Sequence, residues 1–97
     1  METLTIVAKF VVKPDKLEFV KAELRKLVQP TRAEEGCILY GLHQNNVNQN
    51  HFVFYETWST HDLWQQHMKS SHITAFLEST DGFFETVSIH EMSKLEN

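Results

Sequence analysis

The sequence has few of the residues on which several common kinds of site depend. It contains one cysteine, Cys37, which excludes an intramolecular disulfide and any cysteine-based zinc or iron–sulfur site within one chain. Its three glycines, at positions 36, 41 and 82, are scattered and form no phosphate-binding loop. No run of Lys or Arg exceeds two residues and the formal net charge is -4. We therefore do not expect a nucleic-acid partner.

Long apolar stretches are absent as well. The N-terminal METLTIVAKFVV is apolar but alternating, it lacks the basic region and cleavage site of a signal peptide, and no stretch long enough to span a membrane follows. We expect a cytoplasmic protein with no membrane contact. A hydrophobic fraction of 41% and a charged fraction of 23% are typical of a globular protein, here one domain over residues 1–97.

Hydrophobic periodicity predicts the element order β, α, β, β, α, β. Residues 3–12 alternate as in a strand, and residues 15–35 carry apolar side chains three and four apart, as in one amphipathic helix. Pro30 is expected to kink this helix and Gly36 to close it. Residues 37–44 and 51–58 form a hairpin around a polar turn. A helix from position 61, a second short helix after the serines at 70 and 71, and a strand over 83–92 complete the chain.

This order predicts an α+β, ferredoxin-like fold in which two helices cover one face of a four-stranded antiparallel sheet. The segment HFVFYETW is apolar on both faces, with Phe52, Phe54 and Trp58 on one and Val53 and Tyr55 on the other. The helices can cover only one of these faces. Because large bare apolar patches are uncommon on monomers, we expect a second copy of the sheet to cover the other, giving a two-fold dimer.

The segment WQQHMKSSHITAF contains two histidines on faces that are predicted to be apolar. His67 follows Leu63 by four residues and Trp64 by three, and His72 precedes Phe76 by four. A buried imidazole needs a hydrogen-bond partner, so each is either a packing residue with a satisfied ring or part of a working site.

Glu56 shares a strand face with Phe52, Phe54 and Trp58. If the helices cover that face, a carboxylate and the two imidazoles share an aromatic-walled pocket suited to proton transfer to a flat organic substrate. A strand-end ion pair is the alternative for Glu56, as a core role is for the tryptophans. The spacing of positions 61, 67 and 72 does not place three imidazoles on one side of a helix, so we expect no metal site.

Together, the motifs resemble those of the antibiotic biosynthesis monooxygenase domain family over nearly the whole chain. EEGC at positions 34–37 is similar to the family's E-x-G-C motif after the first helix, and YETW at positions 55–58 is similar to its Y/F-E-x-W strand. His67, His72 and Phe76 match its H-x-x-x-x-H-x-x-x-F helix pattern.

The resemblance implies a homodimeric α+β barrel with a pocket between sheet and helices. It also implies oxidation of a small quinol or phenolic compound by molecular oxygen, with no metal or flavin. The substrate's own anion would reduce oxygen while the protein orients the ring and moves protons. On this reading His67 or His72 transfers the proton and Glu56 orients the substrate. The substrate-binding residues would be Trp58, Trp64, Phe52, Tyr40 and Phe76.

Three other readings remain open. One branch with a similar YE core and paired histidines isomerises a small phosphorylated hydroxydiketone from quorum-signal breakdown, and only Lys69 and Arg32 are candidates for its phosphate. A haem-degrading branch is disfavoured because the first strand has no Asn. The last reading is a non-catalytic, small-molecule-binding dimer. An open cleft with perturbed pKa values would favour catalysis, and a sealed cluster bonded to backbone would favour binding or a structural role.

Overall fold

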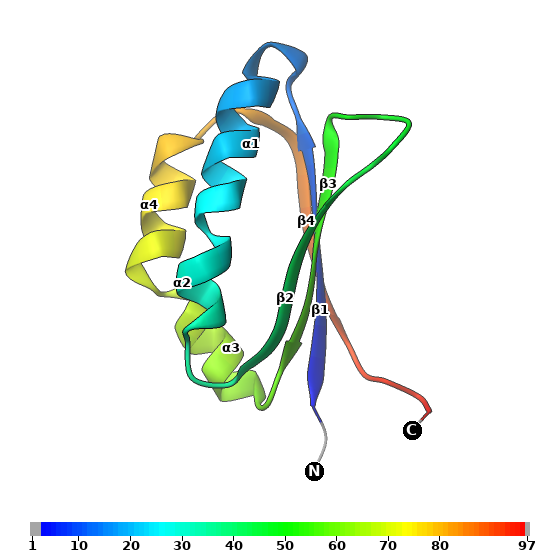
Figure 1. The fold of residues 1–97 in the computed structure, drawn as a ribbon, viewed down its shortest axis with the longest axis vertical. Helices are drawn as coiled ribbons and strands as arrows, with labels where there is room; N and C mark the ends of the chain where they lie inside the picture. The colour runs from blue at the N-terminus through cyan, green and yellow to red at the C-terminus, as the bar shows by residue number, and fades with distance from the viewer. Residues whose placement is uncertain (1–2, 97) are drawn as a thin grey trace.

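A four-stranded antiparallel sheet forms one layer of the molecule, and the helices form the other, in a computed structural model that describes residues 3–96 (Figure 1). The strand order is β2-β3-β1-β4. The strands are β1 (Leu4–Val12), β2 (Cys37–Gln44), β3 (His51–Trp58) and β4 (Phe84–Met92). The helices are η1 (Pro14–Lys16), α1 (Leu17–Lys26), α2 (Val28–Arg32), α3 (His61–Met68) and α4 (Ser71–Ser79). The predicted α+β, ferredoxin-like fold is confirmed.

The helical segment after β1 is divided where the sequence predicted one continuous helix. A 3-10 turn, η1, precedes α1, and the chain breaks again at Leu27 before α2. Pro30 has no N–H to bond to the carbonyl of Lys26, so the α-helical ladder cannot run through this point. The helix also ends earlier than predicted, at Arg32. Within residues 3–96, no helix is long and apolar enough to cross a membrane.

Gly36 has a different role from the helix cap that was predicted. It lies in the turn between α2 and β2 with a φ of 87°, a conformation that glycine adopts without steric cost. A Cβ added there would stand 2.8 Å from the Cβ of Leu63. The turn can therefore press closely against α3, which brings Glu34 to helices α3 and α4.

Strand register decides which side chains of the sheet lie under the helices. Ala8 pairs with Phe54, and Ile6 pairs with Glu56, which in turn pairs with Tyr40 on β2. These five side chains are all buried, so the carboxylate of Glu56 is set into the apolar face of the sheet. The sequence prediction that Glu56 shares the face of the buried aromatic residues is confirmed.

The opposite face of the sheet carries no helix (Figure 1). Val7 and Tyr55, which are paired across β1 and β3, point to this side, and the Tyr55 ring is exposed. The predicted dimer through this face stays a prediction, because the structure contains one chain.

Candidate active site

A small cavity lies between the sheet and helices α3 and α4. Its volume is about 70 Å³, several times the ~10–15 Å³ needed for one water molecule. Leu77 on α4 and Val87 on β4 are 52% and 49% exposed, so they mark its mouth. The lining is apolar apart from three groups, and consists of Ile6, Ala8, Phe10, Leu27, Tyr40, Phe54, Glu56, Trp64, His67, Met68, Ile73, Phe76, Leu77, Val87 and Ile89.

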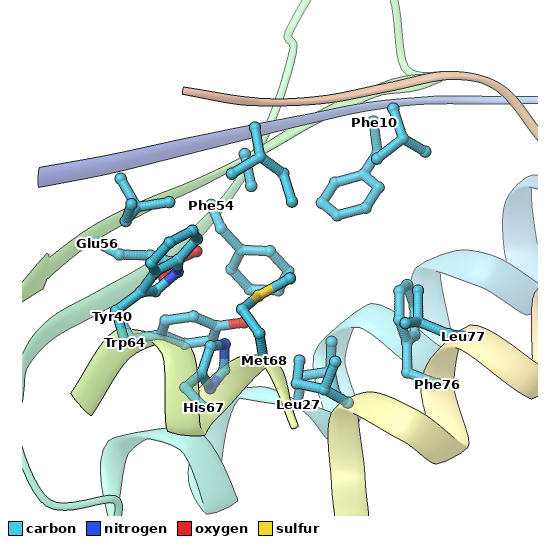
Figure 2. A pocket seen from close by; sticks show the side chains of 15 residues that line it. Phe10, Leu27, Tyr40, Phe54, Glu56, Trp64, His67, Met68, Phe76 and Leu77 are labelled. Carbon is cyan, nitrogen blue, oxygen red and sulfur yellow. The ribbon is translucent and has the colours of Figure 1, made fainter. Parts of the chain in front are cut away.

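The three polar groups of the lining gather at one end of the cavity. Figure 2 shows Tyr40, Glu56 and His67 at this end, and Phe10, Phe76 and Leu77 at the other. A molecule in the cavity would therefore have an apolar contact surface along its length and proton-carrying groups at one end. This is the usual composition of a site for a small organic molecule.

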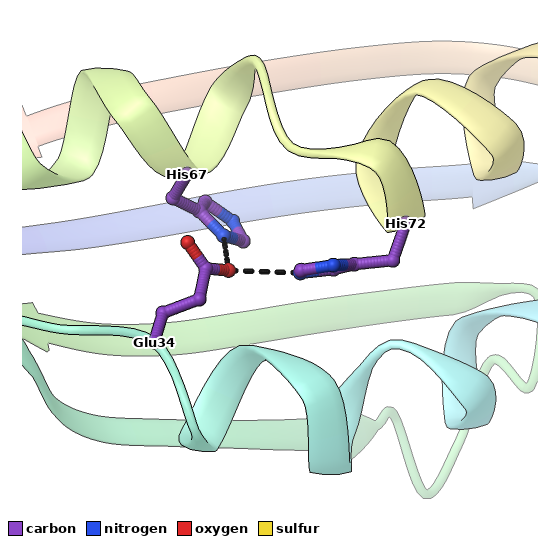
Figure 3. Close-up of side chains that lie close together, drawn as sticks. All are labelled: Glu34, His67 and His72. Atoms are coloured by element: carbon purple, nitrogen blue, oxygen red, sulfur yellow. Dashed lines mark hydrogen bonds and ion pairs between the residues drawn. The ribbon is translucent and has the colours of Figure 1, made fainter.

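His67 is one of two imidazoles that meet a single carboxylate (Figure 3). Its Nδ1 lies 2.7 Å from Oε2 of Glu34, and Nε2 of His72 lies 2.8 Å from the same oxygen. The His67 side chain is only 2% exposed, whereas Glu34 is 18% and His72 21% exposed. The cluster thus extends from the cavity wall at His67 to the partly solvated ring of His72.

Local sequence signals place each of these residues on its own element, and the packing of three separate elements brings them together. Thr60 caps α3 through a 3.1 Å hydrogen bond from the N–H of Leu63, and His67 sits in the last turn of that helix. Ser70 is the N-cap of α4, which begins one residue before His72. Glu34 comes from the turn that Gly36 allows to approach α3. The carboxylate of Glu34 therefore cross-links this turn to both helices.

Glu56 supplies the second acidic group, and it is 3% exposed. Its Oε1 accepts a hydrogen bond of 2.8 Å from the indole Nε1–H of Trp58. Burial raises the pKa of Glu56 to about 7, with a further increase from the charge of Glu34 and an opposing effect of the bond from Trp58. Near neutral pH both the protonated and the ionised form of this carboxyl are therefore accessible, and it can donate or accept a proton.

Burial favours the neutral forms of the other two polar groups in the lining, His67 and Tyr40. It lowers the pKa of His67, although the hydrogen bond to Glu34 opposes this change, and it raises the pKa of Tyr40 far above its usual range. The rings of Trp58 and Tyr40 pack against the imidazole of His67, with centroids 4.8 and 5.7 Å away. A neutral, tightly held imidazole at the cavity wall is an arrangement suited to accepting a proton.

The structure divides the predicted site residues into two sets. His67, Glu56, Tyr40, Trp64 and Phe76 line the cavity. The side chains of His72, Trp58 and Phe52 are not among the lining residues: His72 bonds to Glu34, Trp58 bonds to Glu56, and Phe52 belongs to the core.

The sequence reasoning assigned no site role to Glu34, which it treated only as part of the helix end. The signal was nevertheless present, since Glu34 is the acidic residue of the E-x-G-C motif and histidines on faces that are predicted to be apolar need a partner. Its distance of 33 residues from His67 in the chain hid the contact.

Glu34, His67 and His72 also form a group whose possible metal-ligand atoms lie within 4.8 Å of one another. However, Nδ1 of His67 and Nε2 of His72 are both at hydrogen-bonding distance from the same oxygen, Oε2 of Glu34. A zinc ion would have to stand ~2.0–2.2 Å from each ligand and displace the protons between them. In this arrangement the carboxylate of Glu34 is the hydrogen-bond partner of one nitrogen of each imidazole.

Comparison with known proteins agrees with this architecture. Residues 3–79 match the family model described as "Antibiotic biosynthesis monooxygenase". The protein named "Putative monooxygenase YcnE" of Bacillus subtilis is 36% identical over 66 residues, which are 68% of this chain and 70% of that protein. An uncharacterized protein of Synechocystis is 28% identical over 79 residues, which are 81% of this chain and 54% of that protein. The chain thus spans about half the length of this relative.

Among solved structures, the crystal structure of PA3566 from Pseudomonas aeruginosa superposes with a TM-score of 0.94 at 30% identity. The match covers 99% of this chain and 97% of that one. The whole course of the chain, including the elements that carry Glu34, His67 and His72, therefore has a counterpart of known structure.

Proposed function

Because the chain belongs to the antibiotic biosynthesis monooxygenase family, we propose that it is an oxygenase for a small phenol or hydroquinone that uses molecular oxygen and no bound cofactor. The observation that carries this proposal is the pairing of a buried, carboxylate-bound imidazole with a carboxyl of raised pKa at one end of an apolar cavity. Phenol oxidation needs these parts: a group that removes the O–H proton, a group that holds the oxygen, and a dry surface for the ring.

In the proposed reaction His67 accepts the phenolic proton. The electron-rich anion then transfers electrons to molecular oxygen, a bond forms between oxygen and a ring carbon, and loss of water leaves a quinone. Overall, one ring C–H, the phenolic O–H and one molecule of oxygen become the two C=O groups of the quinone and one molecule of water. Glu56, in its protonated form, can hydrogen-bond to the substrate oxygen, and His67 can return its proton to the departing water.

The dimensions of the cavity favour a substrate with a single ring. A volume of about 70 Å³ is well below the ~300 Å³ at which pockets for drug-sized ligands begin. A larger aromatic system would have to extend through the mouth beside Leu77 and Val87. We therefore expect hydroquinones to be better substrates than naphthalenediols.

The cavity does not favour the alternative of a phosphorylated hydroxydiketone. Of the residues that the structure describes, none of those lining the cavity is Lys or Arg. Arg32 donates from Nε to the carbonyl of Tyr40 at 3.0 Å, and Lys69 borders a separate surface pocket with Trp64 and Met68. A phosphate in the cavity would thus lose water without gaining a charged partner.

A non-catalytic binding protein would be favoured if the side chains of His67, His72 and Glu56 were sealed from solvent and hydrogen-bonded to backbone. Here Glu34 bonds to both imidazoles through its side chain, and His67 and Glu56 line a cavity with an exposed rim. The perturbed pKa values of His67 and Glu56 add to the support for catalysis.

Oxygen uptake measured on an electrode tests the proposal. Purified, chelator-treated protein is given a panel of hydroquinones, phenols and naphthalenediols, and isotopically labelled oxygen is traced into the product. We expect uptake that His67→Ala reduces by about 10²- to 10⁴-fold, the usual contribution of a general base. Gln66→Ala, at an exposed position of α3 beside His67, is the control and should match the unmodified protein. No uptake above the spontaneous rate across the panel would overturn the proposal.

The proposal includes a cytoplasmic homodimer. The support for the homodimer is the open face of the sheet around Val7 and Tyr55, together with the modest core that a chain of 97 residues can build. The cytoplasmic location is carried over from the expectation drawn from the sequence.

A further inference from the structure

The hydrogen bonds of Glu34 limit where the protons of the cluster can be. An ionised carboxylate can only accept hydrogen bonds, so each imidazole that approaches it must present an N–H group. His67 approaches Oε2 with Nδ1, and His72 approaches the same atom with Nε2. The Nδ1 of His67 therefore carries a proton, and in the neutral ring the other nitrogen, Nε2, carries none.

Because Glu34 engages Nδ1 of His67, Nε2 is the ring nitrogen that remains for a molecule in the cavity to meet. His67 lines the cavity, whereas Glu34 and His72 are not among the lining residues. Among the hydrogen bonds within residues 3–96, His67 takes part through its side chain only by Nδ1. The rings of Tyr40 and Trp58 also pack against this imidazole, with centroids 5.7 and 4.8 Å away.

We propose that Glu34, held in place by His72, is a positioning residue that fixes His67 in the Nδ1–H tautomer and so makes the cavity selective for molecules with an O–H donor. The tautomer and the selectivity can be measured without turnover, whereas their catalytic consequence rests on the proposed function. A group that only accepts hydrogen bonds, such as an ether oxygen, would face the unshared pair of Nε2 and gain no bond there.

His72 acts through Glu34 in this arrangement. The Glu34 side chain is 18% exposed and comes from a turn, so by itself it can adopt other rotamers. The N–H of His72 occupies a second acceptor site of Oε2 and holds the carboxylate toward His67. His72 is thus assigned a positioning role, which differs from the direct proton transfer that the sequence left open for it.

Nuclear magnetic resonance of protein labelled with nitrogen-15 at histidine tests the tautomer directly. We expect His67 in the unmodified protein to be the Nδ1–H form. Glu34→Gln is the matched control, because its amide oxygen can accept from both imidazoles. Glu34→Met has a similar length and no acceptor oxygen, and should shift His67 toward the Nε2–H form that free imidazole side chains prefer in water.

Anaerobic calorimetry with phenol and anisole, the methyl ether of phenol, tests the selectivity. For each variant we take the ratio of the dissociation constant of anisole to that of phenol. The added methyl group contributes equally to this ratio in both variants, so the comparison between variants removes its effect. We expect the preference for phenol to be about 3- to 10-fold greater in Glu34→Gln than in Glu34→Met, the effect of one hydrogen bond.

The Nε2–H form of His67 in the unmodified protein would overturn the inference, and this result is decisive even if Glu34→Met does not fold. An equal phenol preference in the Gln and Met variants would overturn it as well. The expected tautomer and preference without any oxygen uptake would instead overturn the proposed function and leave this inference standing.

Discussion

Replacement of Glu56 by Gln should make the stability of the protein less sensitive to pH. The pKa of this carboxyl is raised by burial from the ordinary 4.5 to about 7. Between these values the folded state binds the proton more tightly than the unfolded state does, so stability falls as the pH rises. The contribution is fully present below about pH 4.5 and is lost as the pH rises through about 7.

The size of the effect follows from this difference in pKa. Each unit of pKa difference is worth ~1.36 kcal/mol, so the rise in the pKa of Glu56 from 4.5 to about 7 corresponds to about 3 kcal/mol of unfolding free energy. Gln keeps the shape of the side chain and an oxygen that can accept from Nε1 of Trp58, but it does not ionise. We therefore expect Glu56→Gln to match the unmodified protein near pH 4.5 and to exceed it by about 3 kcal/mol near pH 8.5.

Urea unfolding followed by tryptophan fluorescence at a series of pH values measures this difference. All other titrations are common to both proteins and cancel. Glu85→Gln, on the exposed surface of β4, is the control and should give parallel curves. Trp58→Phe removes the hydrogen bond that lowers the pKa of Glu56, so it should extend the fall in stability to higher pH. Parallel curves for Glu56→Gln would refute the reasoning.

Two further predictions concern the fold and the assembly. Gly36→Ala should lower the unfolding free energy by about 3 kcal/mol, because its φ is 87° and the new Cβ would stand 2.6 Å from Cδ1 of Leu63. Gly82→Ala, with a φ of 79° and no atom within 4 Å, should cost only about 1 kcal/mol; equal losses in urea unfolding would contradict the steric explanation. Tyr55→Asp should halve the mass measured by light scattering, since a charge would be buried in the proposed interface, and a monomeric unmodified protein would refute the dimer.

The element order was readable from the sequence because each element has a complete local signal. The alternation of β1 and β3 and the caps at Thr60 and Ser70 act within a few residues of one another. The interruption at Leu27 was harder to place, because Pro30 removes a hydrogen bond to a residue four positions earlier and the pattern of apolar side chains continues through the break.

The candidate site was only partly readable. Period-two alternation placed Glu56 on the buried face, and helical spacing placed His67 on the apolar stripe, where both now line the cavity. Helical spacing could not show that His67 lines the cavity and His72 does not. It indicates which face of its own helix a residue occupies, but not what packs against that face. Nor could it show that Trp58 serves Glu56 as a hydrogen-bond donor instead of lining the cavity.

The sequence by itself therefore determined the fold, the family resemblance and the side chains available for proton transfer, since periodicity, capping and turn chemistry act over short distances along the chain. The tertiary structure alone decided the partnership of Glu34 with His67 and His72, which lie 33 and 38 residues away. Such a contact depends on how the turn at Gly36 packs against two helices, and no local pattern encodes that packing. It is this packing that directs one imidazole to the cavity and the other to the surface.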